Sequence, residues 1–229
     1  MHADPKLLER PPWSALTTTH SDFALGNDLA RRYQPDIAPM AAIREVSDTC
    51  LRAMAALMSP GEVVGLFDAE AVSVGGKLVA IAHKTVEQMV NEQGRAAPFC
   101  EEYVNPTPAD VPEMMRLTEL TKPGPFSPRT IELGSYIGIR CGGKLVAMAG
   151  ERMRFDGFTE ISAVCTHPDH CRRGRASLLV SALMRNIISR GETPFLHIYS
   201  DNARAAALYK KLGFTRRRSI TVTILKRVV

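Results

Sequence analysis

The chain has 229 residues, of which 45% are hydrophobic and 23% charged, and its net charge is +5. This balance excludes an intrinsically disordered chain and predicts a globular protein with one large domain or two small ones. The positive charge favours anionic partners, but it does not distinguish nucleic acid from a phosphate-bearing cofactor.

The sequence carries no sign of membrane insertion or secretion. No apolar stretch approaches the roughly 18 residues of a spanning helix, and the opening residues lack the apolar core of a secretory signal. The cysteines are odd in number and scattered, at Cys50, Cys100, Cys141, Cys165 and Cys171. This usage is typical of reduced thiols. We therefore predict a cytoplasmic protein with no disulfide and no membrane partner.

The first half of the chain gives mixed signals. Residues 1–35 predict irregular or weakly helical structure. Between Ile37 and Met58, apolar residues recur at steps of three and four, which predicts one or two amphipathic helices. The β-favouring segments 61–67 and 77–84 follow, and Gly75-Gly76 between them permits a tight turn. We expect a β-hairpin there.

A proline-rich segment, residues 94–112, lacks periodicity and predicts a connector. We place a domain boundary near residue 105, so that residues 1–105 form an N-terminal half and residues 106–229 a second domain. The hexapeptide GGKLVA occurs at residues 75–80 and again at 142–147. It indicates a duplicated half-fold, although a glycine turn before an apolar strand is common enough to recur by chance.

The second half begins with regular elements. Asp110 predicts the cap of a helix that runs through Thr121 and is broken by Pro123-Gly124-Pro125. Segments 130–140 and 144–152 alternate like strands, and Gly142-Gly143 between them predicts a second hairpin.

The most informative segment starts with a strand over residues 158–166, which Pro168 ends because proline lacks the N–H that a ladder needs. A loop rich in arginine and glycine leads into a helix from Ala176 that closes at Gly191. The free N–H groups of such a helix start bind anions, and Arg172, Arg173 and Arg175 add positive charge. We predict a phosphate site there. Neither a Rossmann fingerprint nor a Walker loop matches, because Gly174 stands alone.

The loop instead resembles the pyrophosphate-binding loop of the GNAT superfamily of acyl-CoA N-acyltransferases. That pattern reads Arg or Gln, two residues, Gly, one residue, then Gly or Ala. Gly174 and Ala176 fit it, whereas Cys171 occupies the leading position and Arg172 follows one place later. Downstream, Asn202 to Phe214 resembles the family's stretch with a spaced Asn and Tyr. The segments THPDH, DNARAAALYKKLGF and ELGSYIGIR look closest to the C-terminal half of glycine N-acyltransferases.

The resemblance covers residues of about 107–229 and implies a GNAT fold of the α/β class. The sheet would be mixed, mostly antiparallel and flanked by helices, with residues 1–105 as a candidate degenerate copy. It also implies an N-acyltransferase that moves an acetyl or other short acyl group from acyl-CoA to a primary amine of a small molecule or amino acid. Acetyl-CoA would be the co-substrate, with no metal and no nucleic acid. The oligomeric state stays open, a homodimer included.

The resemblance also assigns site residues. In the family, backbone N–H groups on the strand before the loop stabilise the oxyanion, the loop holds the pyrophosphate, and the Asn binds the pantetheine arm. The matching positions are Val164, Cys165, Thr166, Arg172, Arg173, Gly174, Arg175, Ala176, Ser177 and Asn202. Tyr209 would protonate the leaving thiolate. Asn202, Ala206 and Tyr209 share a helix face, since offsets of four and seven return to one side.

The base that accepts the amine proton is the weakest assignment. Glu160 is the candidate, on the same strand face as Val164, with Glu132 and His197 as alternatives. Each choice has a plainer interpretation: Tyr209 as a core aromatic residue, and Glu160 as a solvated carboxylate at a sheet edge. The spacing of Cys165, His167, His170 and Cys171 has the chemistry of a zinc site, but a strand end and a helix start would direct these side chains apart.

Two other functions compete with the enzyme. A non-catalytic module on the same fold would bind acyl-CoA or a partner protein, and Cys171 in the leading position motivates it. A nucleic-acid binder would need interleaved aromatic residues, which make up only 6% of the chain. Arg216-Arg217-Arg218 is better explained as the solvated entrance to the alternating strand SITVTILK.

Overall fold

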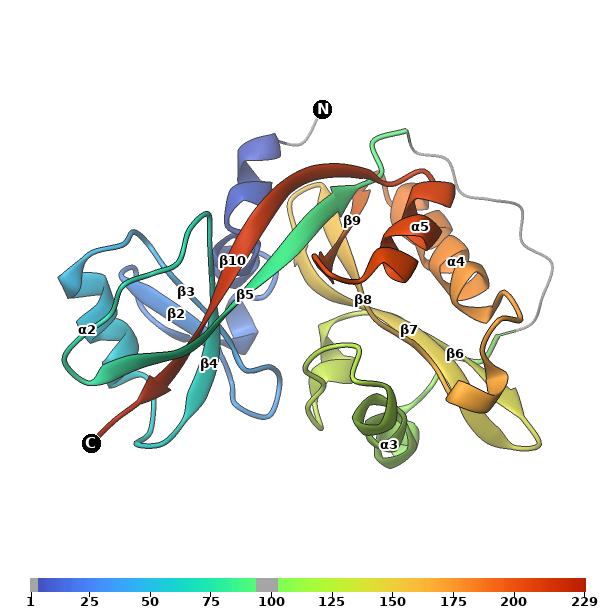
Figure 1. Cartoon of the computed structure of the whole chain (residues 1–229), viewed down its shortest axis with the longest axis horizontal. Helices are drawn as coiled ribbons and strands as arrows, with labels where there is room; N and C mark the ends of the chain where they lie inside the picture. Colours follow the sequence, from blue (N-terminus) through green and yellow to red (C-terminus); the bar gives the residue numbers. More distant parts are fainter. Residues whose placement is uncertain (1–3, 94–102) are drawn as a thin grey trace.

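One mixed β-sheet runs through both halves of the chain. The computed structural model describes residues 4–93 and 103–229. Within them ten strands pair in the order β1-β2-β3-β4-β10-β5-β9-β8-β7-β6. Only the β3–β4 and β8–β9 pairs among them are parallel. The expected mixed, mostly antiparallel sheet flanked by helices is confirmed (Figure 1).

The first half contains more strand than the sequence predicted. Its elements are α1 (Pro11–Thr17), β1 (Ala24–Gly26), β2 (Ala30–Tyr33), β3 (Met40–Ile43), α2 (Asp48–Ala56), β4 (Val63–Asp68) and β5 (Leu78–Val90). The helix predicted from Ile37 is wrong before Ser47, because all four residues of β3 are buried in the sheet. Ser47 then caps α2 by accepting a hydrogen bond from the N–H of Cys50.

The hairpin predicted around Gly75-Gly76 is also wrong. Strand β10 (Thr215–Arg227) lies between β4 and β5 and is antiparallel to both. Strands β4 and β5 therefore run in the same direction and cannot form a hairpin. In Figure 1, β5 and β10 run side by side between the two ends of the molecule. The last strand of the chain thus joins the two halves.

The second half follows the prediction closely. Its elements are α3 (Val111–Thr121), β6 (Tyr136–Cys141), β7 (Lys144–Phe155), β8 (Phe158–Thr166), α4 (Arg175–Ser189), β9 (Thr193–Tyr199) and α5 (Ala203–Lys211). The β6–β7 hairpin is confirmed, with φ of 56° at Gly142 and 80° at Gly143. The strand predicted from Thr130 starts only at Tyr136, because residues Thr130–Leu133 form a 3-10 helix.

Helices α3 and α4 cover opposite faces of the sheet (Figure 1). Ala147 and Ala149 of β7 belong to the core cluster under α4, whereas Met148 between them packs with residues of α3. This alternation follows from the two-residue repeat of a strand. The strands β6, β7 and β8 are therefore covered by helices on both faces. A site that ligands can reach must form at the ends of these strands.

The connector predicted at residues 94–112 begins in a segment, 94–102, that lies outside the described residues, and so does Cys100. Val104 forms a β-bridge with Gly138 of β6.

Cys50, Cys141, Cys165 and Cys171 are free thiols. Among the described residues, no helix combines the length and apolar character that crossing a membrane requires. The boundary at residue 105 and the duplicated half-fold stay predictions.

Because β10 pairs with strands of the first half, we expect both halves to unfold in one transition. The substitution Leu183→Ala empties a fully buried site in α4 and should lower the free energy of unfolding by about 2 to 5 kcal/mol. Trp13, the single tryptophan, lies in α1 of the first half. The urea concentration at the midpoint of unfolding, measured by Trp13 fluorescence, should decrease by the same amount as the midpoint measured by circular dichroism.

The control is Leu120→Ala, at a side chain that is 53% exposed, which should leave both transitions within about 0.5 kcal/mol of wild type. A Trp13 transition that stays in place while the circular dichroism shifts would show that the halves unfold separately.

Candidate active site

The site forms where two parallel strands separate. Strands β8 and β9 are paired from Phe158 and Thr193 up to Glu160 and Phe195. Beyond Glu160 the pairing ends, although β8 continues to Thr166 and β9 to Tyr199. A gap in a sheet exposes backbone polar groups that the ladder no longer uses. The separation therefore provides both space and free hydrogen-bonding groups.

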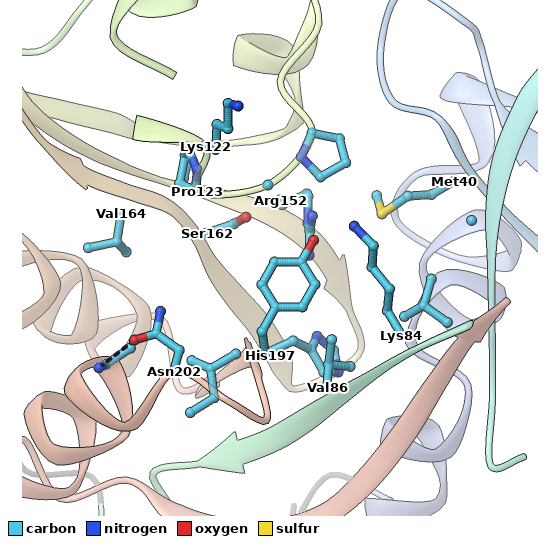
Figure 2. Close-up of a pocket in the computed structure, with 18 of the residues that line it drawn as sticks. Met40, Lys84, Val86, Lys122, Pro123, Arg152, Ser162, Val164, His197 and Asn202 are labelled. Atoms are coloured by element: carbon cyan, nitrogen blue, oxygen red, sulfur yellow. Dashed lines mark hydrogen bonds between the residues drawn. The ribbon is translucent and has the colours of Figure 1, made fainter. Parts of the chain in front are cut away.

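A cavity of about 500 Å³ occupies this separation. Figure 2 shows side chains from both halves of the chain around it, among them Met40 and Lys84 from the first half. The wall also contains the segment after α3, both diverging strands and the start of α5. The second half contributes Lys122, Pro123, Arg152, Ser162, Val164, Cys165, Thr166, His197, Asn202 and Tyr209.

Strand β8 bulges where it faces the cavity. Its register with β7 moves from Ser162 opposite Gly150 to Cys165 opposite Met148, so Ala163 and Val164 share one partner position. Ala163 has φ of 52°, a strained value for a residue with a Cβ. Val164, Cys165 and Thr166, predicted to stabilise an oxyanion, all line the cavity. Burial raises the pKa of the Cys165 thiol to about 11, so this thiol stays protonated.

The loop after β8 presents a run of free backbone donors. The N–H groups from Arg172 to Ser177 donate to no backbone carbonyl in the described part of the chain. Arg172 and Gly174 adopt positive φ, 62° and 76°, which turns the backbone into the start of α4. No acidic residue occupies the first turn of α4. The predicted anion site therefore has free donors at the positive end of a helix dipole.

Side chains hold this loop from inside. The Cys171 thiol lies 3.5 Å from the carbonyl oxygen of His167 and 3.7 Å from that of Thr166. The Arg175 guanidinium donates to the carbonyl oxygen of His170 at 3.0 Å. Arg172 and Arg173 are exposed. Cys171, at the position where the resembling GNAT loops have Arg or Gln, thus packs against the backbone of its own loop. The positive charge on the outer surface of the loop comes from the exposed Arg172 and Arg173.

Helix α5 brings two of the predicted residues to the cavity. Asn202 caps it, accepting a hydrogen bond from the N–H of Ala205 at 3.0 Å, and keeps its amide N–H₂ for other partners. Tyr209 lines the cavity and is 7% exposed, and burial raises the pKa of its phenol. Its ring meets Phe214 edge to face. Ala206, predicted on the same face, packs on the core instead.

Three charged or polar side chains link the strands at the point of separation. Arg152 of β7 donates through Nε and Nη2 to the two oxygens of Glu160 on β8, each at 2.7 Å. His197 of β9 lies 2.8 Å from the same carboxylate through Nδ1. Glu160 is fully buried, and the buried Arg152 and His197 lower its pKa to about 2, against the burial that would raise it.

These contacts correct the assignment of Glu160. It is not a solvated edge carboxylate, because its side chain is inaccessible, and it does not line the cavity. A carboxylate with a pKa of about 2 and three hydrogen bonds is a poor proton acceptor. The geometry supports Glu160 as the group that fixes Arg152 and His197.

The two alternative bases are also engaged elsewhere. Glu132 forms a two-pronged ion pair with Arg129 and does not line the cavity. His197 lines it, but because a carboxylate only accepts hydrogen bonds, Nδ1–H donates to Glu160. Nε2 then accepts from the Gln88 amide at 3.2 Å. Both ring nitrogens therefore have partners.

Several wall residues were missed by the sequence analysis. Arg152, Lys84 and Lys122 gave no motif, since each stands in an ordinary strand or loop context. The one available signal was Arg152 in the apolar stretch KLVAMAGER, where a buried charge requires a partner. Within residues 4–93 and 103–229, no three His, Cys, Asp or Glu side chains are grouped so as to hold a metal ion.

Comparison with known proteins agrees with the fold. The family profile for FR47-like proteins matches residues 136–222. A structure from Novosphingobium aromaticivorans, described as a candidate acetyltransferase from the GNAT family, is 33% identical, with TM-score 0.90, covering 99% of this chain and 100% of that one. A GCN5-related N-acetyltransferase from Kribbella flavida is 14% identical, with TM-score 0.60, covering 99% and 96%. The comparison with curated proteins gives no match.

The fold with its separated strands is the GNAT fold, and the chain belongs to the GNAT family of acetyltransferases. The predicted superfamily and fold class are therefore confirmed, including the helix-flanked sheet of residues 106–229.

The buried ion pair predicts a specific pH dependence of stability. Glu160 has an ordinary pKa of 4.5 and a folded value of about 2, which corresponds to about 3 kcal/mol. A lowered carboxyl pKa stabilises the fold above pH 4.5 and loses this effect as the pH falls toward 2. Glu160→Gln should therefore cost about 3 to 5 kcal/mol at pH 6, where Arg152 loses its counter-charge.

The difference between wild type and Glu160→Gln should narrow by about 2 kcal/mol between pH 6 and pH 3, measured by urea unfolding. The exposed Glu119→Gln is the matched control and should follow wild type at each pH. A constant difference across this range would show that the Glu160 carboxylate is not stabilised by its partners.

Proposed function

We propose that this GNAT protein is an acyl-CoA-dependent N-acyltransferase. It transfers an acetyl or other short acyl group from acyl-CoA to a primary amine of a small molecule or amino acid. The observation that carries the proposal is the order of two features along the chain: β8 lines the cavity as far as Thr166, and the loop that follows leads to the run of free N–H groups at the start of α4. A pyrophosphate at the first would direct its attached arm into the second.

The cofactor assignments follow from this placement. The N–H groups from Arg172 to Ser177 would bind the pyrophosphate, and the exposed Arg172 and Arg173 would add charge-assisted contacts to phosphate oxygens. Asn202 would bind the amide groups of the pantetheine arm through its free N–H₂, since it lines the cavity and uses its oxygen as a cap. The residues present fit acetyl-CoA as co-substrate.

The transfer itself needs a stabilised oxyanion. The amine nitrogen attacks the thioester carbonyl carbon, and the carbonyl oxygen takes up the negative charge. The bulged backbone at Val164, with Cys165 and Thr166, borders the cavity and would supply N–H donors to that oxygen. The strain at Ala163 is the cost of turning this stretch of backbone out of the ladder.

Breaking the C–S bond leaves a thiolate, which Tyr209 would protonate. Its phenol lines the cavity, and its raised pKa keeps the proton on the oxygen before the reaction. Burial raises the pKa of a thiol released in the same place for the same reason, so the phenol donates to a thiolate that is a stronger base than it is in water. The phenolate then recovers a proton from solvent, and the amine nitrogen loses one to water.

The finer resemblance, to the C-terminal half of glycine N-acyltransferases, rests on the sequence and stays a prediction, as does a cytoplasmic location, and the oligomeric state stays open. The alternative function is a module that binds acyl-CoA without turnover. The lack of an Asp or Glu in the described cavity wall favours it. Release of free thiol in the presence of an amine distinguishes the two: binding without release would support the module.

A negative charge at the start of α4 should weaken coenzyme A binding without unfolding the protein. Ala176→Asp places a carboxylate in the first turn, where it favours the helix dipole but repels a pyrophosphate. We expect the Kd for coenzyme A, measured by calorimetry, to rise at least about tenfold, while Tm stays equal or rises slightly.

The matched control is Thr49→Asp, an exposed position in the first turn of α2, a helix that does not line the cavity. It should leave the Kd unchanged. Unaltered coenzyme A affinity in Ala176→Asp would remove the loop from the binding site.

Removing the Tyr209 hydroxyl should slow turnover and leave binding intact. For Tyr209→Phe we expect kcat to fall by about 10²- to 10⁴-fold, the range for general acids, with coenzyme A affinity close to wild type. Tyr136→Phe is the control, because the Tyr136 hydroxyl is buried with no hydrogen-bond partner in the described residues. Thiol release measures both. Wild-type turnover in Tyr209→Phe would exclude the acid role.

A further inference from the structure

The cavity wall has charges of one sign only. Among the described residues, its ionisable wall side chains include the cations Lys84, Lys122 and Arg152, and no Asp or Glu. Glu160 lies behind Arg152 and is outside the wall. A fully cationic substrate, such as a diamine, would be repelled by Lys84 and Lys122, whereas the charge of Arg152 is largely balanced by Glu160.

Arg152 has one nitrogen left for a ligand. Its side chain is 10% exposed, and Nε and Nη2 are both bound to Glu160. Its third nitrogen, Nη1, makes no hydrogen bond within the part of the chain that the structure describes. Because Glu160 fixes the plane of the guanidinium, Nη1 is held in one orientation at the cavity wall.

Lys84 adds a second cation from the other half of the chain. Its ammonium lies 5.3 Å from the centre of the Tyr199 ring. This contact uses the ring face and leaves the ammonium protons available for hydrogen bonds. In Figure 2 the Lys84 side chain extends into the cavity and points toward Arg152, while Lys122 lies on the opposite wall.

Resting on the proposed function, we infer that the acceptor is an amine with a neighbouring carboxylate, an α-amino acid, whose carboxylate binds between Lys84 and Arg152. A carboxylate accepts a hydrogen bond from each of two cations with good geometry. It also neutralises part of the positive field, which no residue of the described wall does.

The same charges explain how the amine is deprotonated without a carboxylate base. The α-amine at a peptide N-terminus has a pKa of about 8 and a lysine side chain one of about 10.4, and in a free amino acid the adjacent carboxylate raises the α-amine pKa above the N-terminal value. Binding of that carboxylate to Lys84 and Arg152 offsets its charge, and the nearby cations disfavour the protonated amine. The α-amine of a bound amino acid therefore loses its proton more easily than the same amine in water.

The test compares acceptors that differ only in the carboxylate. With acetyl-CoA as donor, thiol release is measured for each common amino acid, for its amide, and for 1,4-diaminobutane. We expect kcat/KM for the best amino acid to exceed that for its amide by about ten- to a hundredfold. Amides or the diamine reacting as fast as amino acids would overturn this inference and leave the proposed function standing. No release with any acceptor would overturn the proposed function itself.

A variant then assigns the carboxylate contact. Lys84→Gln should raise KM for the preferred amino acid about tenfold or more, while KM for its amide and for acetyl-CoA stays unchanged. Lys144→Gln, at an exposed lysine that does not line the cavity, is the control and should match wild type. Equal Tm values show that both variants fold. If Lys84→Gln keeps the full preference for the carboxylate, Lys84 is not its binding partner.

Discussion

The structure of the site depends on the ion pair between Arg152 and Glu160, extended by His197. These residues come from three adjacent strands, β7, β8 and β9, at the level where β8 and β9 stop pairing. Separated strands lose their ladder bonds, so something other than backbone must fix their spacing. A buried carboxylate with three donors does this.

The separation and the bulge together decide what the cavity can do. In the proposed function, the separation of β8 and β9 would give the acyl-CoA arm a path, and the bulge at Ala163 would direct backbone donors toward it. The first half then covers the far side, contributing Met40, Gly65 and Lys84. The proposed cofactor site therefore comes from one half of the chain and the proposed acceptor site from both. This division explains why the loop had a recognisable motif and the acceptor wall had none.

Local signals predicted the second half well. The cap at Asn202, the turn at Gly142-Gly143 and the end of β8 before Pro168 each depend on neighbours in sequence, and each is where the pattern placed it. The predictions for the first half were wrong where the structure depends on pairing between strands that are distant in sequence. Residues Met40–Ile43 were predicted as helix but form a strand that is buried in the sheet. Strand β5 was predicted to pair with β4 but pairs with β10, some 130 residues later. The role predicted for Glu160 was wrong for the same reason, since Arg152 and His197 come next to it only when the strands pair.

The position of β10 also bears on how the protein is made. Because β10 comes late in the sequence and completes the pairing of both β4 and β5, neither of these two strands has its full ladder until residues 215–227 have been synthesised. Until then β4 and β5 each present an open edge, the kind of edge that pairs with other chains. A nascent chain interrupted before Thr215 thus has two unpaired strand edges, which are open to aggregation until β10 is added.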